Sequence, residues 1–145
     1  MKMDASITLN LSGHSKYVLD ALAAFQQIGW NIYNPEGKVE YIPLGDRDHY
    51  DWQSDEMSES AFFDLAAKKL ANKEPVVVNL FFEGGKEGVT FLAEDTENIL
   101  LNLSIHRRCA RGRNTDMAWY WQNIICRFLE ADIRVLSYTL AEVED

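Results

Sequence analysis

The stretch PVVVNLFFEGGKEGVTFLAEDTENILLNLSI, residues 75–105, decides the fold. It contains three apolar runs typical of strands, at 75–82, 88–93 and 98–105, joined by a glycine-rich segment and an acidic turn. No helical pattern separates them, and strands that follow one another directly pair in antiparallel fashion. The stretch therefore indicates an antiparallel sheet rather than repeated strand–helix–strand units.

The segment before this stretch predicts a strand, a helix and a hairpin. Residues 6–11 alternate between apolar and polar side chains, which indicates a half-buried strand. Ser15 is placed to cap a helix that ends at Gly29. The apolar face of that helix is formed by Val18, Leu22, Phe25 and Ile28. Residues 30–33 and 38–44 then flank the turn NPEG and predict a hairpin.

Two further helices complete the pattern. Ser58 is placed to cap the second helix, whose face contains Phe62, Leu65, Ala66 and Leu70. Pro75 prevents this helix from continuing. After a polar loop, the third helix begins near Asp116 and carries Trp121, Ile125, Phe128 and Leu129, and a final strand covers 133–140.

These elements predict one domain over residues 1–145. The predicted class is α+β, with a single, mostly antiparallel sheet of about six to seven strands and three helices. The predicted order is β-α-β-β-α-β-β-β-α-β, and strand order within the sheet does not follow from it.

Composition and charge restrict the classes of function. The chain carries a net charge of −9, with a pI near 4.8, which argues against binding nucleic acid or anionic membranes and favours a basic protein partner. The first residues lack the continuous apolar core of a signal peptide, and no apolar run is long enough to span a membrane. With two cysteines and no disulfide framework, we expect a cytoplasmic protein.

Residues 44–60, LGDRDHYDWQSDEMSES, interrupt the pattern with six acids against a single base, Arg47. An EF-hand beginning at Asp46 fails, because Tyr50 takes the fifth position and Met57 the twelfth. Asp46, Asp48 and His49 could coordinate a transition metal, but nothing enforces the geometry, so no metal and no cofactor are expected. The other alternative is a flexible connecting loop.

Aromatic side chains among these acids favour a protein interface, in which rings act as anchors within a charged rim. The predicted partner-binding residues are Asp46, Asp48, Tyr50, Asp51, Trp52, Asp55 and Glu56, with a second patch at Glu94, Asp95 and Glu97. For Trp52, the alternative is that it docks the loop onto the core.

Elsewhere the chain shows no catalytic signature, and we expect that it is not an enzyme. Four arginines, Arg107, Arg108, Arg111 and Arg113, are expected to pair with nearby carboxylates, such as those of 94–97 or of the C-terminal tail, rather than with nucleic acid. Cys109 lies among these arginines, which favours its thiolate, but no signature of a nucleophile surrounds it.

Small size, acidity, the acid-and-aromatic motif DRDHYDW and the lack of catalytic signatures together give the chain a recognisable character. In these respects it resembles bacterial immunity proteins, in particular those carried beside contact-dependent growth-inhibition toxins. The resemblance implies a protein that binds one cognate toxin domain, often a nuclease, and covers its basic active-site or substrate-binding surface. The alternatives are an acidic regulatory or adaptor protein for another basic partner, and a small-molecule binder or enzyme with a pocket between sheet and helices.

Overall fold

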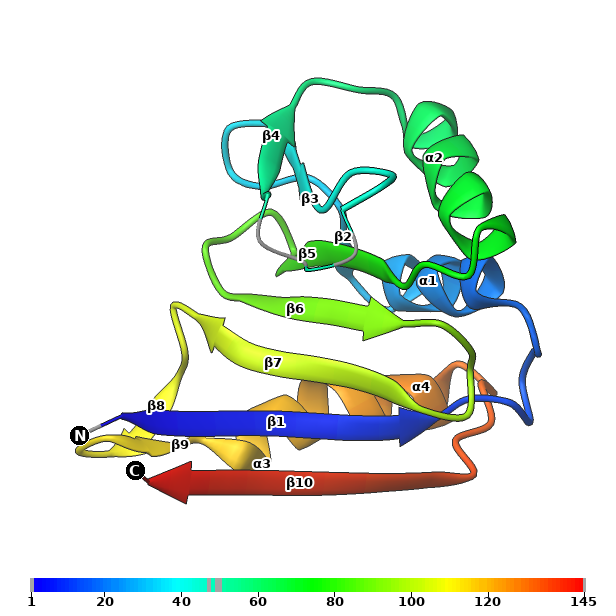
Figure 1. The fold of residues 1–145 in the computed structure, drawn as a ribbon. Coiled ribbons are helices and arrows are strands. Elements are labelled where there is room, and N and C mark those ends of the chain that lie inside the picture. Colours follow the sequence, from blue (N-terminus) through cyan, green and yellow to red (C-terminus); the bar gives the residue numbers. More distant parts are fainter. Residues whose placement is uncertain (1, 47, 49–50, 145) are drawn as a thin grey trace.

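Eight strands form one antiparallel sheet in the computed structural model of the chain, which describes residues 2–46, 48 and 51–144 (Figure 1). The strand order is β10-β1-β7-β6-β5-β3-β4, and β2 also pairs with β5. The strands of this sheet are β1 Met3–Asn10, β2 Trp30–Asn31, β3 Val39–Tyr41, β4 Gln53–Asp55, β5 Val76–Phe82, β6 Gly88–Ala93, β7 Ile99–Ile105 and β10 Ser137–Glu144. A separate two-stranded hairpin is formed by β8 Cys109–Arg111 and β9 Asn114–Thr115.

Three helices accompany the sheet, so the predicted α+β class is confirmed. They are α1 Val18–Gln27, α2 Glu59–Ala71 and a third helix built from α3 Met117–Tyr120, the π-helical segment η1 Trp121–Ile125 and α4 Cys126–Glu130. Of the helices in the described residues, none combines the length and the apolar character needed to cross a membrane.

The hydrophobic core lies between one face of the sheet and the helices. Phe25 of α1 stands at its centre, fully buried, with its ring edge-on to Phe91 of β6 at 5.6 Å and to Phe128 of α4 at 5.0 Å. The alternating residues Ile7 and Leu101, on β1 and β7, pair in register beneath the helices and are likewise fully buried. Burial of this apolar surface supplies the main driving force for folding.

The predicted cap at Ser58 is confirmed, and the third helix, predicted to begin near Asp116, is capped by that residue. The Ser58 hydroxyl accepts a hydrogen bond from Ala61 N at 3.1 Å, and the Asp116 carboxylate accepts one from Trp119 N at 3.1 Å. The prediction for Ser15 is wrong, because the residue before the first helical turn is Tyr17. The Ser15 hydroxyl instead accepts a hydrogen bond from the backbone N–H of Tyr17, two residues further along the chain, at 3.0 Å.

The predicted hairpin around NPEG is only partly present. Its turn is closed by the Asn34 side chain and by one bridge between Tyr33 and Val39, but β2 and β3 both pair with β5. The central strand β5 is buried and needs partners for its backbone along its whole length. The two short strands β2 and β3 together provide these partners on one side of β5, and a local sequence pattern does not predict this arrangement.

Strands β4 and β8–β9 arise where the sequence indicated loops. Their residues are mostly polar and exposed, so they lack the apolar alternation that marks a half-buried strand. Backbone pairing with a neighbour, rather than burial of side chains, defines them.

In the described part of the chain, the helices lie on one face of the sheet and no helix covers the other face (Figure 1). On this second face, uncharged polar residues form a row across the strands. In register across four strands, this row contains Asn79, Thr90, Asn102 and Ser6, on β5, β6, β7 and β1. Thr90 donates to the Asn79 side chain at 2.7 Å, and Asn79 donates to the Glu40 carboxylate at 2.8 Å. This row is therefore polar, whereas the neighbouring row on the same face, Val77, Leu92, Leu100 and Thr8, is mostly apolar.

Candidate functional site

Residues 44–60, the acidic segment, follow β3 and end in the first turn of α2. The segment includes β4, the outermost strand at one edge of the sheet (Figure 1). Among its predicted binding residues, Asp48, Asp51, Trp52, Asp55 and Glu56 are exposed, and Asp46 is half-buried. The predicted contact Tyr50 lies outside the described residues, as does His49 of the alternative metal site.

The middle of the segment is held by its own side chains. The Asp46 carboxylate accepts a hydrogen bond from the Asp51 backbone N–H at 2.6 Å, which closes the loop between them. The Gln53 amide donates to the Asp51 carboxylate at 3.0 Å. These contacts restrict the side chains of Asp46 and Asp51 before any partner arrives, and side chains restricted in advance lose less conformational entropy on binding.

The far end of the segment is fastened to the sheet by a hydrogen bond from Tyr41 to Asp55. The phenolic hydroxyl of Tyr41, on β3, donates to the Asp55 carboxylate on β4 at 2.7 Å. Burial of the ring, together with this hydrogen bond and the negative charge of Asp55, raises the pKa of Tyr41 to about 12.

The near end of the segment is anchored by two buried charged residues that the sequence interpretation missed. Lys69 of α2 is 2% exposed and donates to the Ile42 carbonyl at 2.7 Å, while Glu74 is 3% exposed and accepts from Gly45 N at 2.8 Å. Burial lowers the pKa of Lys69, and the nearby charges of Glu74 and Asp46 oppose that shift. The signal was present in the sequence, because Lys69 falls on the same helical face as Phe62 and Ala66.

Between these two anchors, the surface presents an aromatic ring among carboxylates. The side chain of Trp52 is 42% exposed, and Leu44 at the start of the segment is 41% exposed. Exposed Asp48, Asp51 and Glu56 lie close to Trp52 in the chain. Trp52 thus does not pack fully onto the core, and the segment combines a ring with a charged surround, as interface anchors do.

The second predicted patch, Glu94, Asp95 and Glu97, forms the turn between β6 and β7. The Asp95 carboxylate accepts from the backbone N–H groups of Glu97 and Asn98, at 3.0 Å each, so it shapes the turn itself. Within the described part of the chain, no hydrogen bond or ion pair joins this turn to the acidic segment. The structure therefore shows two separate acidic surfaces.

The arginine cluster lies on and beside the β8–β9 hairpin. Arg107 donates to the Thr115 hydroxyl at 2.7 Å and lies 3.9 Å from the Glu142 carboxylate of β10. The guanidinium of Arg108 stacks over the Trp119 ring at 4.7 Å. Arg107 thus lies near a carboxylate of the C-terminal strand, as predicted, whereas Arg108 stacks on the Trp119 ring.

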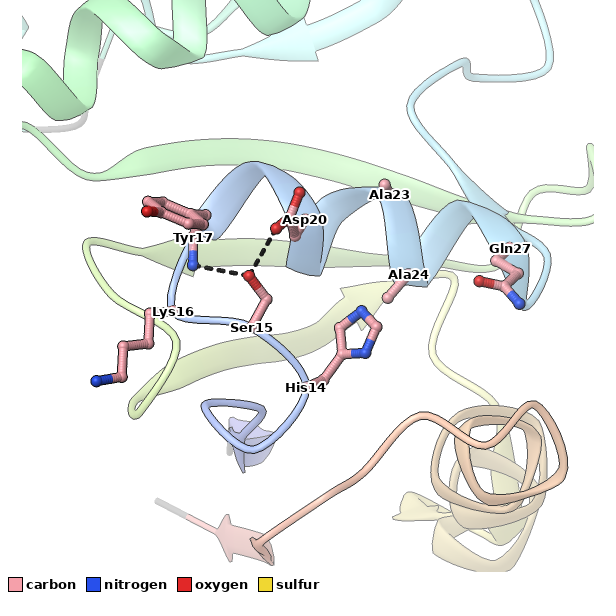
Figure 2. A pocket seen from close by; sticks show the side chains of 8 residues that line it. All are labelled: His14, Ser15, Lys16, Tyr17, Asp20, Ala23, Ala24 and Gln27. Atoms are coloured by element: carbon pink, nitrogen blue, oxygen red, sulfur yellow. Dashed lines mark hydrogen bonds between the residues drawn. The ribbon is translucent and has the colours of Figure 1, made fainter.

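A hollow of about 550 Å³ runs along α1 and contains His14, Ser15, Lys16 and Asp20 in its wall (Figure 2). The Ser15 hydroxyl donates to Asp20 at 2.6 Å and accepts from Tyr17 N, and neither contact is the histidine partner that would activate a serine nucleophile. Cys109 is exposed on the hairpin, and its thiol contacts the Arg107 carbonyl at 3.7 Å. In the described residues, no three His, Cys, Asp or Glu side chains gather as metal ligands would.

No family model matches the chain, and comparisons with curated proteins and with solved structures found no similar protein.

Proposed function

We propose that the chain is an immunity protein, which binds a cognate toxin domain and covers its basic active-site or substrate-binding surface. The observation that supports this most directly is the acidic segment, which is fastened at both ends and exposes Trp52 between its carboxylates. A nuclease is the kind of toxin that fits best, because a surface that holds phosphate backbones must be positive.

The exposed carboxylates and the Trp52 ring would contribute to different steps of binding. Exposed carboxylates attract a basic surface over a long range and raise the association rate, an effect that salt weakens. Trp52 would enter a pocket on the toxin and slow dissociation, as buried aromatic anchors do. Fast association matters for an inhibitor that must act before its target does damage.

The experiment is to measure binding and protection with the toxin domain encoded beside the gene of this chain. Asp48→Asn with Glu56→Gln changes two exposed carboxylates that make no hydrogen bond among the described residues, so folding should be unaffected. We expect the association rate to fall about tenfold at low salt, with a smaller fall at high salt. Trp52→Ala should raise the dissociation rate by about tenfold or more, because anchors of this kind contribute about 2 kcal/mol.

The matched control is Glu130→Gln with Asp132→Asn, which removes the same charge at the end of α4, outside the acidic segment. Its binding and protection should equal those of the wild type. If the variant that combines Asp48→Asn, Glu56→Gln and Trp52→Ala still protects cells and binds with wild-type affinity, the acidic segment is not the toxin-binding site.

A further inference from the structure

Strand β10 is the outermost strand at the edge of the sheet opposite the acidic segment (Figure 1). All eight of its residues, Ser137–Glu144, pair with β1, and within the described residues no strand pairs with its other side. By contrast, the strand at the far edge, β4, has three residues and carries the charge of Asp55. One edge of the sheet is therefore short, whereas the other is long, open on its outer side and charged only at Glu142 and Glu144.

Open edge strands attract other strands, and most proteins protect them with proline, inward-pointing lysine, a bulge or a covering loop. The sequence of β10, SYTLAEVE, contains no proline, glycine or lysine. Its pairing with β1 is continuous and shows no bulge. The backbone N–H and C=O groups on its outer side can therefore accept a further strand.

Apolar side chains gather along the same edge. Leu136, which precedes β10, is 46% exposed, and within the strand Tyr138 is 44% and Val143 is 57% exposed. Leu140 lies between them and is half-buried. A strand that pairs here would cover part of this surface as well as satisfying backbone groups.

We infer that β10 is a dimerisation strand, on which β10 of a second copy of the chain pairs in antiparallel fashion about a two-fold axis at Leu140. Directly opposed residues in a sheet lie on the same face, and this register satisfies that condition. The opposed pairs are Leu140 with Leu140, Thr139 with Ala141, Tyr138 with Glu142, and Ser137 with Val143. Leucine meets leucine at the centre, and small uncharged residues meet on the open face.

Charge argues against registers whose axis lies closer to Glu142. With the axis at Leu140, the two Glu142 carboxylates are offset by four residues along the strands, about 13 Å at the usual rise. That separation exceeds the screening length of about 8 Å at physiological salt. An axis at Glu142 would place these carboxylates opposite each other, which destabilises a sheet. Glu142 also lies close to Arg107 within its own chain, which offsets its charge.

The dimer would leave the acidic segment free, because β4 and β10 are the two edges of one sheet. Two copies would then form a continuous sheet with an acidic segment at each end. This inference does not depend on the proposed function, since the assay below uses the chain alone.

The test measures the molar mass of the chain by light scattering and sedimentation between about 1 and 200 μM. We expect a species of twice 16.6 kDa that grows with concentration. Thr139→Lys with Ala141→Lys places lysines opposite each other across the axis, and the variant should remain a monomer. The matched control is Ser6→Lys with Thr8→Lys, because these residues pair with Ala141 and Thr139 on the same face, one strand further in. The control should dimerise as the wild type does.

Charge reversal tests the register itself. Mixing the Thr139→Lys/Ala141→Lys chain with a Thr139→Glu/Ala141→Glu chain should restore the dimer, since each lysine then faces a glutamate. A wild-type chain that stays monomeric over the whole range would overturn the inference, as would a dimer that the edge lysines leave intact. If the edge lysines abolish toxin protection while the wild type is a monomer, the strand belongs to the toxin interface and not to a second copy.

Discussion

Replacing Tyr41 by phenylalanine should destabilise the protein in a way that depends on pH. The variant loses the hydrogen bond from the Tyr41 hydroxyl to the Asp55 carboxylate, 2.7 Å long, and keeps the ring that packs against Phe62. Hydrogen bonds to charged groups contribute about 1.5–3 kcal/mol. Because Asp55 is exposed and water can replace the lost donor, we expect the free energy of unfolding to fall by about 1 kcal/mol at pH 7.

At alkaline pH the difference between the two proteins should shrink. The pKa of Tyr41 is about 12 in the folded state, against 10.0 for an ordinary tyrosine, so between these values the folded state keeps a proton that the unfolded state has lost. Protonated Tyr41 makes its full contribution to the free energy of unfolding below pH 10, and this contribution is lost as the pH rises through 12. At pH 11 the wild type should have lost at most about 1.4 kcal/mol of this stabilisation, and less because water screens the exposed Asp55 carboxylate, so its advantage over the phenylalanine variant should fall toward zero.

The assay is urea unfolding of both proteins at intervals between pH 7 and pH 11. The matched control is Tyr33→Phe, which removes a hydroxyl that donates to the Met57 carbonyl at 2.9 Å instead of to a carboxylate. The stability of this control should follow the wild-type dependence on pH. A constant difference between wild type and Tyr41→Phe from pH 8 to pH 11 would refute the reasoning, because Tyr41 would then not hold its proton more tightly in the folded state.

Two further variants test whether Lys69 anchors the acidic segment and whether Glu142 stabilises the β8–β9 hairpin. Lys69→Met leaves the buried Ile42 carbonyl without its donor and should cost about 1–3 kcal/mol in urea unfolding at pH 7. Because burial lowers the pKa of Lys69, the folded state releases this proton at a lower pH than the unfolded state does. The difference in free energy of unfolding between the wild type and Lys69→Met should therefore decrease as the pH rises toward 10.5, because the wild type loses stability over this range and the variant has no such proton to release. A difference that increases over this range would contradict this account. The Glu142 carboxylate accepts from Asn114 Nδ2 at 2.9 Å and Thr115 N at 2.6 Å, contacts that lower its pKa to about 2. Glu142→Gln should therefore loosen β8–β9 and speed trypsin cleavage in the hairpin, seen by mass spectrometry, whereas equal cleavage of wild type and variant would show that this carboxylate does not hold the hairpin.

Local patterns in the sequence determined most of the fold. The period of two at Ile99, Leu101 and Leu103, the cap at Ser58 and the start of the third helix near Asp116 each depend on a few residues, and the structure contains them as predicted. The class of the sheet also followed, because three strands in succession leave little alternative to antiparallel pairing. The acidic composition of residues 44–60 is visible in the sequence in the same direct way.

Only the tertiary structure decided which strands became edges and which polar residues became anchors. The sequence predicted the last strand at 133–140, followed by an acidic tail, whereas β10 covers Ser137–Glu144. Its place at an open edge depends on pairing with β1, more than 120 positions earlier in the chain. Glu74 follows the second helix outside any periodic pattern, and only the folded chain buries it and brings its carboxylate to Gly45 N. Such long-range contacts depend on how whole elements pack together. They form because folding buries apolar surface and requires a partner for every buried backbone group, and a short window of sequence shows neither effect.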